Sequence, residues 1–275
     1  MIVRYRRPQA VGDGRQRRRY TLARMDATGP TLLRRALAVL QAKQYLAFYA
    51  IPLYALAALV PLVLSWLHDG GSVDDVLGRT KASAFDVAAA PGLAAVGIFV
   101  LYVAVYAWFR AGLIRSIVGR FHLRPHDGAQ FASLLGLQLI IEALNGVGAW
   151  VIVSADDAAV ASVAGVVLFA LSIAIMYSDY AIVITGLDPA RAIARSWACV
   201  RANLLLSTLL ALTVSLIAMT VATLLAQMVT DGFAQALPLL VIDVVVLGLV
   251  TFVADVVLVI AYVHAVETGR LPRAR

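Results

Sequence analysis

The chain has 275 residues, of which 62% are hydrophobic and only 14% are charged. Soluble domains carry about 25% charged residues, so this composition excludes a water-soluble fold, which could not cover so much apolar surface. Cys199 is the only cysteine, which excludes an internal disulfide and a two-cysteine metal or redox site. The four histidines lack metal-ligand spacing, and we therefore expect one membrane domain without a metal or a cofactor.

Both ends of the chain are short basic segments. Residues 1–30 are rich in arginine and lack the apolar stretch of a secretory signal peptide, so we expect a disordered cytoplasmic tail. Residues 267–275 are expected to form a second basic cytoplasmic tail. Translation could start at Met1 or at Met25, and the sequence leaves this choice open.

Residues 31–266, between the two tails, contain six apolar runs. These runs cover residues 44–67, 91–112, 129–153, 159–180, 204–229 and 238–264. Each exceeds the roughly 20 residues that a helix needs to cross a ~30 Å hydrocarbon core. Lipid offers no partner to an unpaired backbone group, so such runs form helices. The sequence therefore predicts an all-α, polytopic transmembrane bundle of six spans, the second of which continues to about Arg120.

The charged residues are segregated by these spans. The three loops assigned to one side carry two basic and seven acidic residues, whereas the other side holds 21 of the 23 lysines and arginines. Basic residues stay in the cytoplasm, so we expect a cytoplasmic (inner) membrane protein with both termini inside. With five acidic residues, the cytoplasmic side has a net charge of +16, which predicts attraction to anionic lipid headgroups. The basic residues flank spans instead of forming one folded face, so nucleic acid is not an expected partner.

A short amphipathic helix is predicted at residues 31–43, before the first span. Leu33, Leu37 and Leu40 share one face of this helix, and its basic side chains can reach lipid headgroups. We expect the helix to lie in the membrane interface.

A second interfacial helix is predicted at about 189–201. Asp188 suits the N-cap and Pro189 the first helical position. We expect the helix to lie flat on the membrane with its tryptophan at headgroup level. Its apolar face is expected to be Ile193, Trp197 and Val200, and its basic residues are Arg191, Arg195 and Arg201.

The segment DYAIVITGLDPARAIARSWACVRAN, residues 179–203, resembles a recurrent segment of bacterial six-helix membrane proteins. This group includes the membrane domain attached to some glycerophosphoryl diester phosphodiesterases, together with stand-alone relatives. The resemblance implies a fold and a membrane location, and it carries over no catalytic residue, since the phosphodiesterase chemistry belongs to a separate soluble barrel for which this chain has no room. The pattern is carried by Asp179, Gly186, Ala192, Ser196, Trp197, Arg201 and Asn203.

A polar stripe runs along the third predicted span. Gln138, Glu142 and Asn145 occupy adjacent turns and share a face. A carboxylate at the bilayer centre costs roughly 2.5–3.5 kcal/mol on insertion scales, so Glu142 needs a partner, a water cavity or a proton. Two interpretations stay open: the stripe forms hydrogen bonds between helices, or it lines a path for a solute or protons.

Three charged residues fall at a common depth near the cytoplasmic ends of their spans. We expect Arg110 to pair with Asp179 or Asp255, because leaving either charge alone in the membrane is costly. The alternative is that each side chain reaches the interface separately.

No zinc-protease motif, nucleophile elbow or phosphate-binding loop is present, so we expect no catalytic residues. The leading hypothesis is a non-catalytic, membrane-embedded module that interacts with lipid or protein. A small transporter or channel that uses the polar stripe is the alternative, and a membrane enzyme comes third. Gly128, Ala132 and Gly136 recur at four-residue spacing, which predicts close helix packing and leaves a homo-oligomer open.

Overall fold

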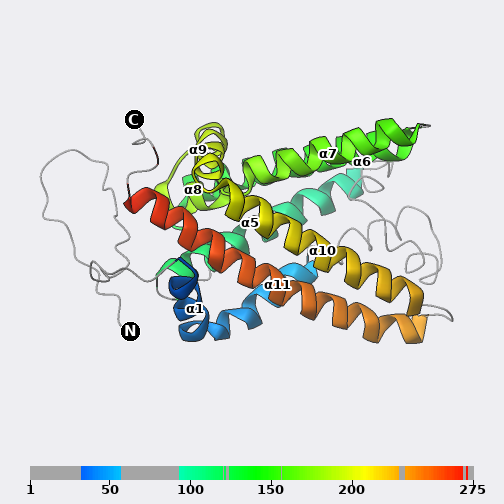
Figure 1. Cartoon of the computed structure of the whole chain (residues 1–275), viewed down its shortest axis with the longest axis horizontal. Coiled ribbons are helices and arrows are strands. Elements are labelled where there is room, and N and C mark those ends of the chain that lie inside the picture. The colour runs from blue at the N-terminus through cyan, green and yellow to red at the C-terminus, as the bar shows by residue number, and fades with distance from the viewer. Residues whose placement is uncertain are drawn as a thin grey trace, which may run out of the picture.

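We describe a computed structural model of the chain, shown in Figure 1. It describes residues 32–56, 93–119, 121, 124–155, 157–228, 233–268 and 271. Within these residues all regular structure is helical and no strand occurs. The predicted all-α class is therefore confirmed for this part of the chain. The basic tail 1–30, the candidate start sites and the loop 68–90 lie outside the described residues.

The helices follow one another with short connections. They are α1 (Leu32–Ala42), a short 3-10 helix η1 (Gln44–Leu46), helical residues 47–56, α5 (Leu93–Val118), α6 (Gly128–Ser154), α7 (Ala158–Ile175), α8 (Ser178–Thr185), α9 (Pro189–Ala202), α10 (Leu204–Met228) and α11 (Phe233–Glu267). The helices predicted for the second, third, fifth and sixth spans are confirmed by α5, α6, α10 and α11.

Five helical stretches of the described chain are long and apolar enough to cross a membrane. They are Val96–Val118, Gly128–Ile152, Ala158–Thr185, Leu204–Val221 and Val241–Glu267. The predicted first span, 44–67, is described only as far as residue 56, so the count of six spans stays a prediction.

The fourth predicted span is not one continuous helix. It is interrupted at Met176 and Tyr177, which separate α7 from α8. The apolar run gives no sign of this break, because neither residue is a helix breaker. α8 then ends at Gly186, which has a φ of +70° and so adopts the left-handed conformation that glycine tolerates best. This turn redirects the chain into α9, whose N-cap Asp188 accepts a hydrogen bond from the amide of Arg191, as the sequence predicted.

The described helices pack tightly at one end of the molecule and spread apart toward the other. Figure 1 shows α1, α8 and α9 at the end where α11 finishes, and the α6–α7 and α10–α11 connections at the opposite end. The largest buried side chains, including Tyr177, Tyr180 and Tyr262, lie in the packed end. The outer parts of α7 and α10 expose apolar side chains such as Val166 and Leu205, as expected for surfaces that face lipid.

The predicted helix at 31–43 is present as α1, but the face that packs on the bundle differs from the predicted apolar face. Ala36 is buried within the core, whereas Leu37 is exposed. The small alanine lets α1 lie close to α11, and Arg35 reaches Glu267 at the end of that helix, at 3.4 Å. Lys43 continues the attachment, since its ammonium donates to the backbone oxygens of Ser116, Ile117 and Gly119 at the end of α5, at 2.5, 2.9 and 2.5 Å.

The apolar face predicted for the second interfacial helix is divided in the structure. Val200 is buried in the core, Ile193 is half-buried and Trp197 is exposed. The face of α9 that packs on the protein consists of Ala192, Ser196, Cys199 and Val200. The prediction chose the bulkiest apolar side chains for the buried face, whereas close packing selected the small ones.

Two glycines allow helices to approach closely. A Cβ atom at Gly248 of α11 would lie 3.0 Å from the Cα of Ile51, and one at Gly148 of α6 would lie 2.2 Å from Leu168 of α7. At Gly136 the nearest atom belongs to Pro189 of α9, at 3.8 Å, so this part of the predicted small-residue stripe faces the protein's own α9.

Replacing Gly248 by leucine should separate α11 from residues 47–56, because the obstructing atom is backbone and cannot rotate away. We expect the variant to lose about 1–3 kcal/mol of stability, measured by thermal unfolding in mild detergent. Gly97→Leu is the matched control, since no atom lies within 4 Å of a Cβ placed there. Equal melting temperatures for both variants would contradict the packing described here.

Candidate functional site

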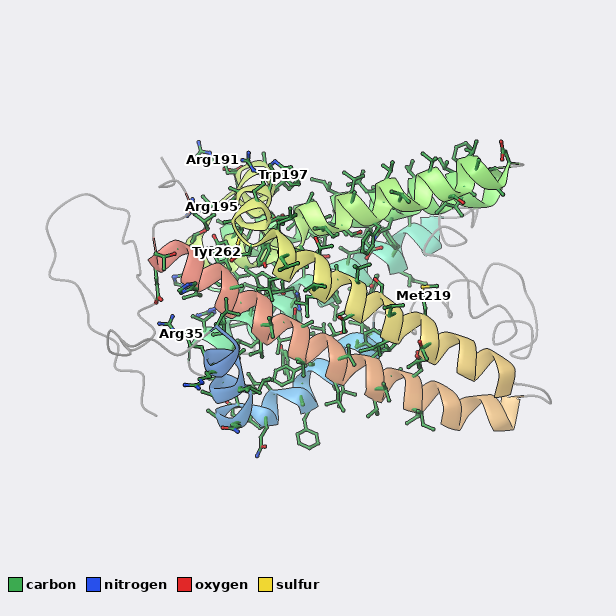
Figure 2. The ribbon with its side chains drawn as sticks, in the orientation of Figure 1. Arg35, Arg191, Arg195, Trp197, Met219 and Tyr262 are labelled. Atoms are coloured by element: carbon green, nitrogen blue, oxygen red, sulfur yellow. The ribbon has the colours of Figure 1, made fainter. Side chains whose placement is uncertain are left out.

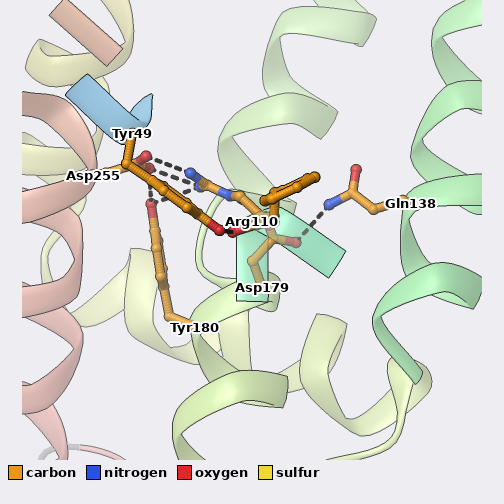
Figure 3. A network of polar contacts seen from close by, with 7 residues as sticks. Tyr49, Arg110, Gln138, Asp179, Tyr180 and Asp255 are labelled. Carbon is orange, nitrogen blue, oxygen red and sulfur yellow. Dashed lines mark hydrogen bonds and ion pairs between the residues drawn. The ribbon is translucent and has the colours of Figure 1, made fainter. Parts of the chain in front are cut away.

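Arg110 lies in the last third of α5 and points into the packed end of the bundle. The residue is only 8% exposed, which is unusual for arginine and requires that its guanidinium be compensated. Acidic side chains from two other helices surround it (Figure 3). The pairing predicted from the sequence is therefore present, and it involves both candidate carboxylates, Asp179 and Asp255, instead of one.

Asp255 of α11 holds the guanidinium with both carboxylate oxygens. One Nη of Arg110 donates to Asp255 Oδ2, and the other donates to Oδ1 at 2.7 Å. The Tyr180 hydroxyl donates to Asp255 Oδ1 at 2.6 Å, and it accepts from Arg110 at 3.2 Å. This two-pronged geometry is the strongest that arginine offers to a carboxylate, and it fixes the orientation of both helices.

Asp179 occupies the first turn of α8, directly after the break in the fourth span. Its Oδ2 accepts from Arg110 Nε at 3.0 Å, and its Oδ1 accepts from the Gln138 amide of α6 at 3.0 Å. The position also places a carboxylate at the positive end of the α8 dipole, which stabilises the negative charge. The network formed by Arg110, Gln138, Asp179, Tyr180 and Asp255 therefore joins α5, α6, α8 and α11.

This network has the chemistry of a structural clamp. All four carboxylate oxygens accept hydrogen bonds, and the guanidinium donates from all three nitrogens. Such mutual satisfaction is what allows charges to remain in a poorly solvated place. The network contains no nucleophilic serine or cysteine, and no group of three potential metal ligands occurs among the described residues.

The polar stripe predicted on the third span is divided. Gln138 is buried and belongs to the network, which supports the hydrogen-bonding interpretation for that residue. Glu142 is half-buried near Tyr102 and Tyr106 and forms no hydrogen bond or ion pair with another described residue. Asn145 is exposed. The three side chains share a helix face but do not form one connected polar path in the described structure.

Ser196 of α9 satisfies the backbone groups that the helix break leaves free. Its hydroxyl accepts from the amide of Tyr177 at 3.0 Å and donates to the carbonyl of Ala174 at 2.7 Å. Without these bonds, two polar groups would be buried without partners, and each would cost about 1–3 kcal/mol. The Tyr177 hydroxyl is also bonded to Ser207 of α10, at 3.1 Å, so the break is tied to two neighbouring helices.

The opposite face of α9 is basic and aromatic. Trp197 is 47% exposed, and the guanidinium of Arg201 lies over its ring at 5.8 Å. Arg191 is exposed and lies 3.3 Å from Asp188 at the start of the same helix. Arg195 differs from these three, because it is half-buried and interacts with the hydroxyl of Tyr262. Figure 2 shows Arg191 and Trp197 pointing away from the bundle.

Cys199 lies on the protein-facing side of α9 and has no exposed surface. Burial raises the pKa of its thiol to about 12, so the thiol is protonated at neutral pH. A protonated, buried thiol is unreactive, which agrees with a packing role for this residue.

Sequence reasoning missed Tyr180 and the bridging role of Ser196. Tyr180 sits in an apolar run and looks like a membrane tyrosine, although its position beside Asp179 could have marked it. Ser196 carries no signal of a bridging role, because the break that it fills is itself invisible in the sequence.

None of the family models, curated proteins or solved structures with which the chain was compared matches it. The geometry of the site therefore carries the functional argument.

A double-mutant cycle measures the network directly. Arg110→Met leaves two carboxylates uncompensated, and we expect a loss of about 3–5 kcal/mol in unfolding free energy, measured in mild detergent. Adding Asp255→Leu should recover part of this loss, with a coupling energy of about 1–3 kcal/mol. The exposed pair of Arg191 and Asp188 is the control and should give a coupling of about 0–1 kcal/mol. Strict additivity at Arg110 and Asp255 would show that the network does not clamp the helices.

Proposed function

We propose that the chain is a non-catalytic, multi-pass protein of the cytoplasmic membrane, and that it acts as a membrane-embedded module that associates with anionic lipid. In this proposal it has six spans, both termini lie in the cytoplasm, and the end that carries α1 and α9 faces the inner leaflet. The described helices that are long enough to cross a membrane support the membrane location. The segregation of basic residues supports the orientation.

One observation carries the proposal: α9 presents its basic and aromatic face to the outside while its small residues pack on the bundle. Trp197, Arg191 and Arg201 are exposed on this face. A helix with this division has the properties of an interfacial helix on an anionic membrane. The exposed Arg34 of α1 adds a second basic position at the same end of the molecule.

The non-catalytic assignment is supported by the use of the buried charged groups. Arg110, Asp179 and Asp255 bond to one another, and each carboxylate oxygen already has a donor. Groups engaged in this way are unavailable for acid–base work on a substrate unless the network opens.

We further propose that the resemblance to the membrane domain attached to some glycerophosphoryl diester phosphodiesterases reflects a shared membrane module. Several residues that carry the resembling pattern have defined places here. Asp179 bonds Arg110, Gly186 adopts the left-handed turn, and Ser196 fills the helix break. The Asn203 amide donates to the carbonyl of Cys199 at the end of α9, at 3.2 Å. A pattern that positions helices supports a shared fold and says nothing of a shared reaction.

Lipid retention tests the proposed function. Protein purified in mild detergent from a membrane of mixed composition should retain anionic phospholipid in excess over its share of the bulk lipid, measured by native mass spectrometry and lipid extraction. Higher salt should reduce the excess, because screening weakens the attraction of exposed arginines. Retained lipid with the bulk composition would contradict the proposal.

Transport remains a second candidate because of Glu142. A half-buried carboxylate on a span without a hydrogen-bond partner among the described residues is the kind of group that proton or solute paths use. The division of the polar stripe weighs against this candidate. Proton flux into proteoliposomes, followed with an internal pH dye, should be negligible and equal for the native protein and Glu142→Gln. A flux that the native protein supports and the variant loses would replace the lipid module by a transporter.

A further inference from the structure

The seating of α9 determines the geometry of the helix break. Ser196 forms two hydrogen bonds across the break, to Tyr177 and to Ala174, and the residues around it on α9 are fully buried. If α9 lifted away, both backbone groups would lose their partner at once. The seated position of α9 and the closed form of the break are therefore one structural state.

The break in turn positions the buried network. Asp179 and Tyr180 lie two and three residues beyond Tyr177, in the first turn of α8, and both contact Arg110. The same short segment thus binds α9 through Tyr177 and binds α5 through its next turn. The break also contains the Ser178 hydroxyl, which is buried without a hydrogen-bond partner in the described part of the chain. An unsatisfied group of this kind lowers the stability of the closed form and makes added support from α9 matter.

The outward face of α9 is matched to a phosphate group at a membrane surface. Arg201 has no acidic neighbour among the described residues, and its charge lies beside an exposed tryptophan. Arg191 is near Asp188, but both side chains are more than half exposed at 69% and 50%, so water screens this pair and the arginine can still contact an anion. Alanines at 190, 194 and 198 separate these side chains, so nothing bulky covers the helix between them.

We propose that Arg191, Trp197 and Arg201 form the binding surface for the headgroup of an anionic phospholipid, and that its occupancy holds α9 seated. This inference rests on the proposed function, because it names the site at which the lipid association occurs. A ligand that binds only the seated orientation of α9 shifts the population toward that state. Lipid at the surface thereby stabilises the break through Ser196 and, beyond it, the contacts of Arg110.

Cys199 provides the readout, because it is the only cysteine and is buried under seated α9. Its alkylation by a maleimide in nanodiscs reports how often α9 lifts away. We expect slower alkylation in nanodiscs of phosphatidylglycerol than in nanodiscs of phosphatidylcholine. In Arg191→Gln/Arg201→Gln this protection should fall by about 30-fold or to nothing, at roughly fivefold for each arginine near the surface. The control Arg34→Gln/Arg124→Gln removes two exposed charges elsewhere and should keep the protection.

Ser196→Ala tests the link between α9 and the break. In phosphatidylcholine we expect roughly tenfold faster alkylation than in the native protein, because one buried hydrogen-bonded group is lost. Ser162→Ala is the control, since Ser162 is exposed and bonds only a carbonyl one turn back, at 2.7 Å. An unchanged rate in Ser196→Ala would overturn the role assigned to Ser196.

The outcomes separate this inference from the proposed function. If native protein retains anionic lipid but the α9 variant and its control are equally protected, the function stands and the site on α9 is wrong. If native protein retains no excess of anionic lipid, the proposed function fails. If phosphatidylglycerol leaves the alkylation of Cys199 in native protein unchanged, occupancy does not hold α9 seated, and the inference is overturned.

Discussion

The pairing of one buried guanidinium with two carboxylates organises the packed end of this protein. Arg110 comes from α5, Asp179 from α8 and Asp255 from α11, so the three helices cannot move independently without breaking charged hydrogen bonds. In a poorly solvated environment, such groups are stable only while they are together. Gln138 and Tyr180 complete the arrangement and leave no carboxylate oxygen without a donor. Hydrophobic packing between apolar helices and lipid is nearly neutral, and polar contacts of this kind therefore choose one helix arrangement among many.

A second constraint is the interruption of the fourth span. Broken helices within membrane proteins persist where neighbouring groups satisfy the freed backbone. Here Ser196 does so from α9, an element that lies at the end of the bundle and turns its basic face outward. The surface helix and the buried charges are therefore connected through a few residues. This connection gives a physical reason why an element at the membrane surface would matter to the interior of the bundle.

The sequence predicted what depends on composition and periodicity. Long apolar runs predicted α5, α6, α10 and α11, and the Asp188–Pro189 pair predicted the start of α9. The cost of an isolated charge in lipid predicted that Arg110 would find an acidic partner. It could not predict that both carboxylates would be used, because the depth of a residue along a span does not determine how helices are rotated about their axes.

The predictions that failed depended on close packing. Leu37 and Trp197 were assigned to faces by their hydrophobicity, whereas Ala36 and Ser196 occupy the tight contacts. Likewise, Gln138 and Glu142 share a helix face but have different surroundings, which the spacing alone cannot distinguish. Small residues at helix contacts and the break at Tyr177 depend on which helices are neighbours. That information lies in the three-dimensional arrangement and not in any local pattern.

The central claim is that Arg110 is clamped between Asp179 and Asp255. Nuclear magnetic resonance of arginine-labelled protein in lipid nanodiscs tests this claim most directly, because a clamped guanidinium cannot rotate about its Nε–Cζ bond. We expect separate, slowly exchanging Nη signals for Arg110, and averaged signals for the exposed Arg191. A single averaged Nη signal for Arg110 would show that its guanidinium is free and would contradict this account.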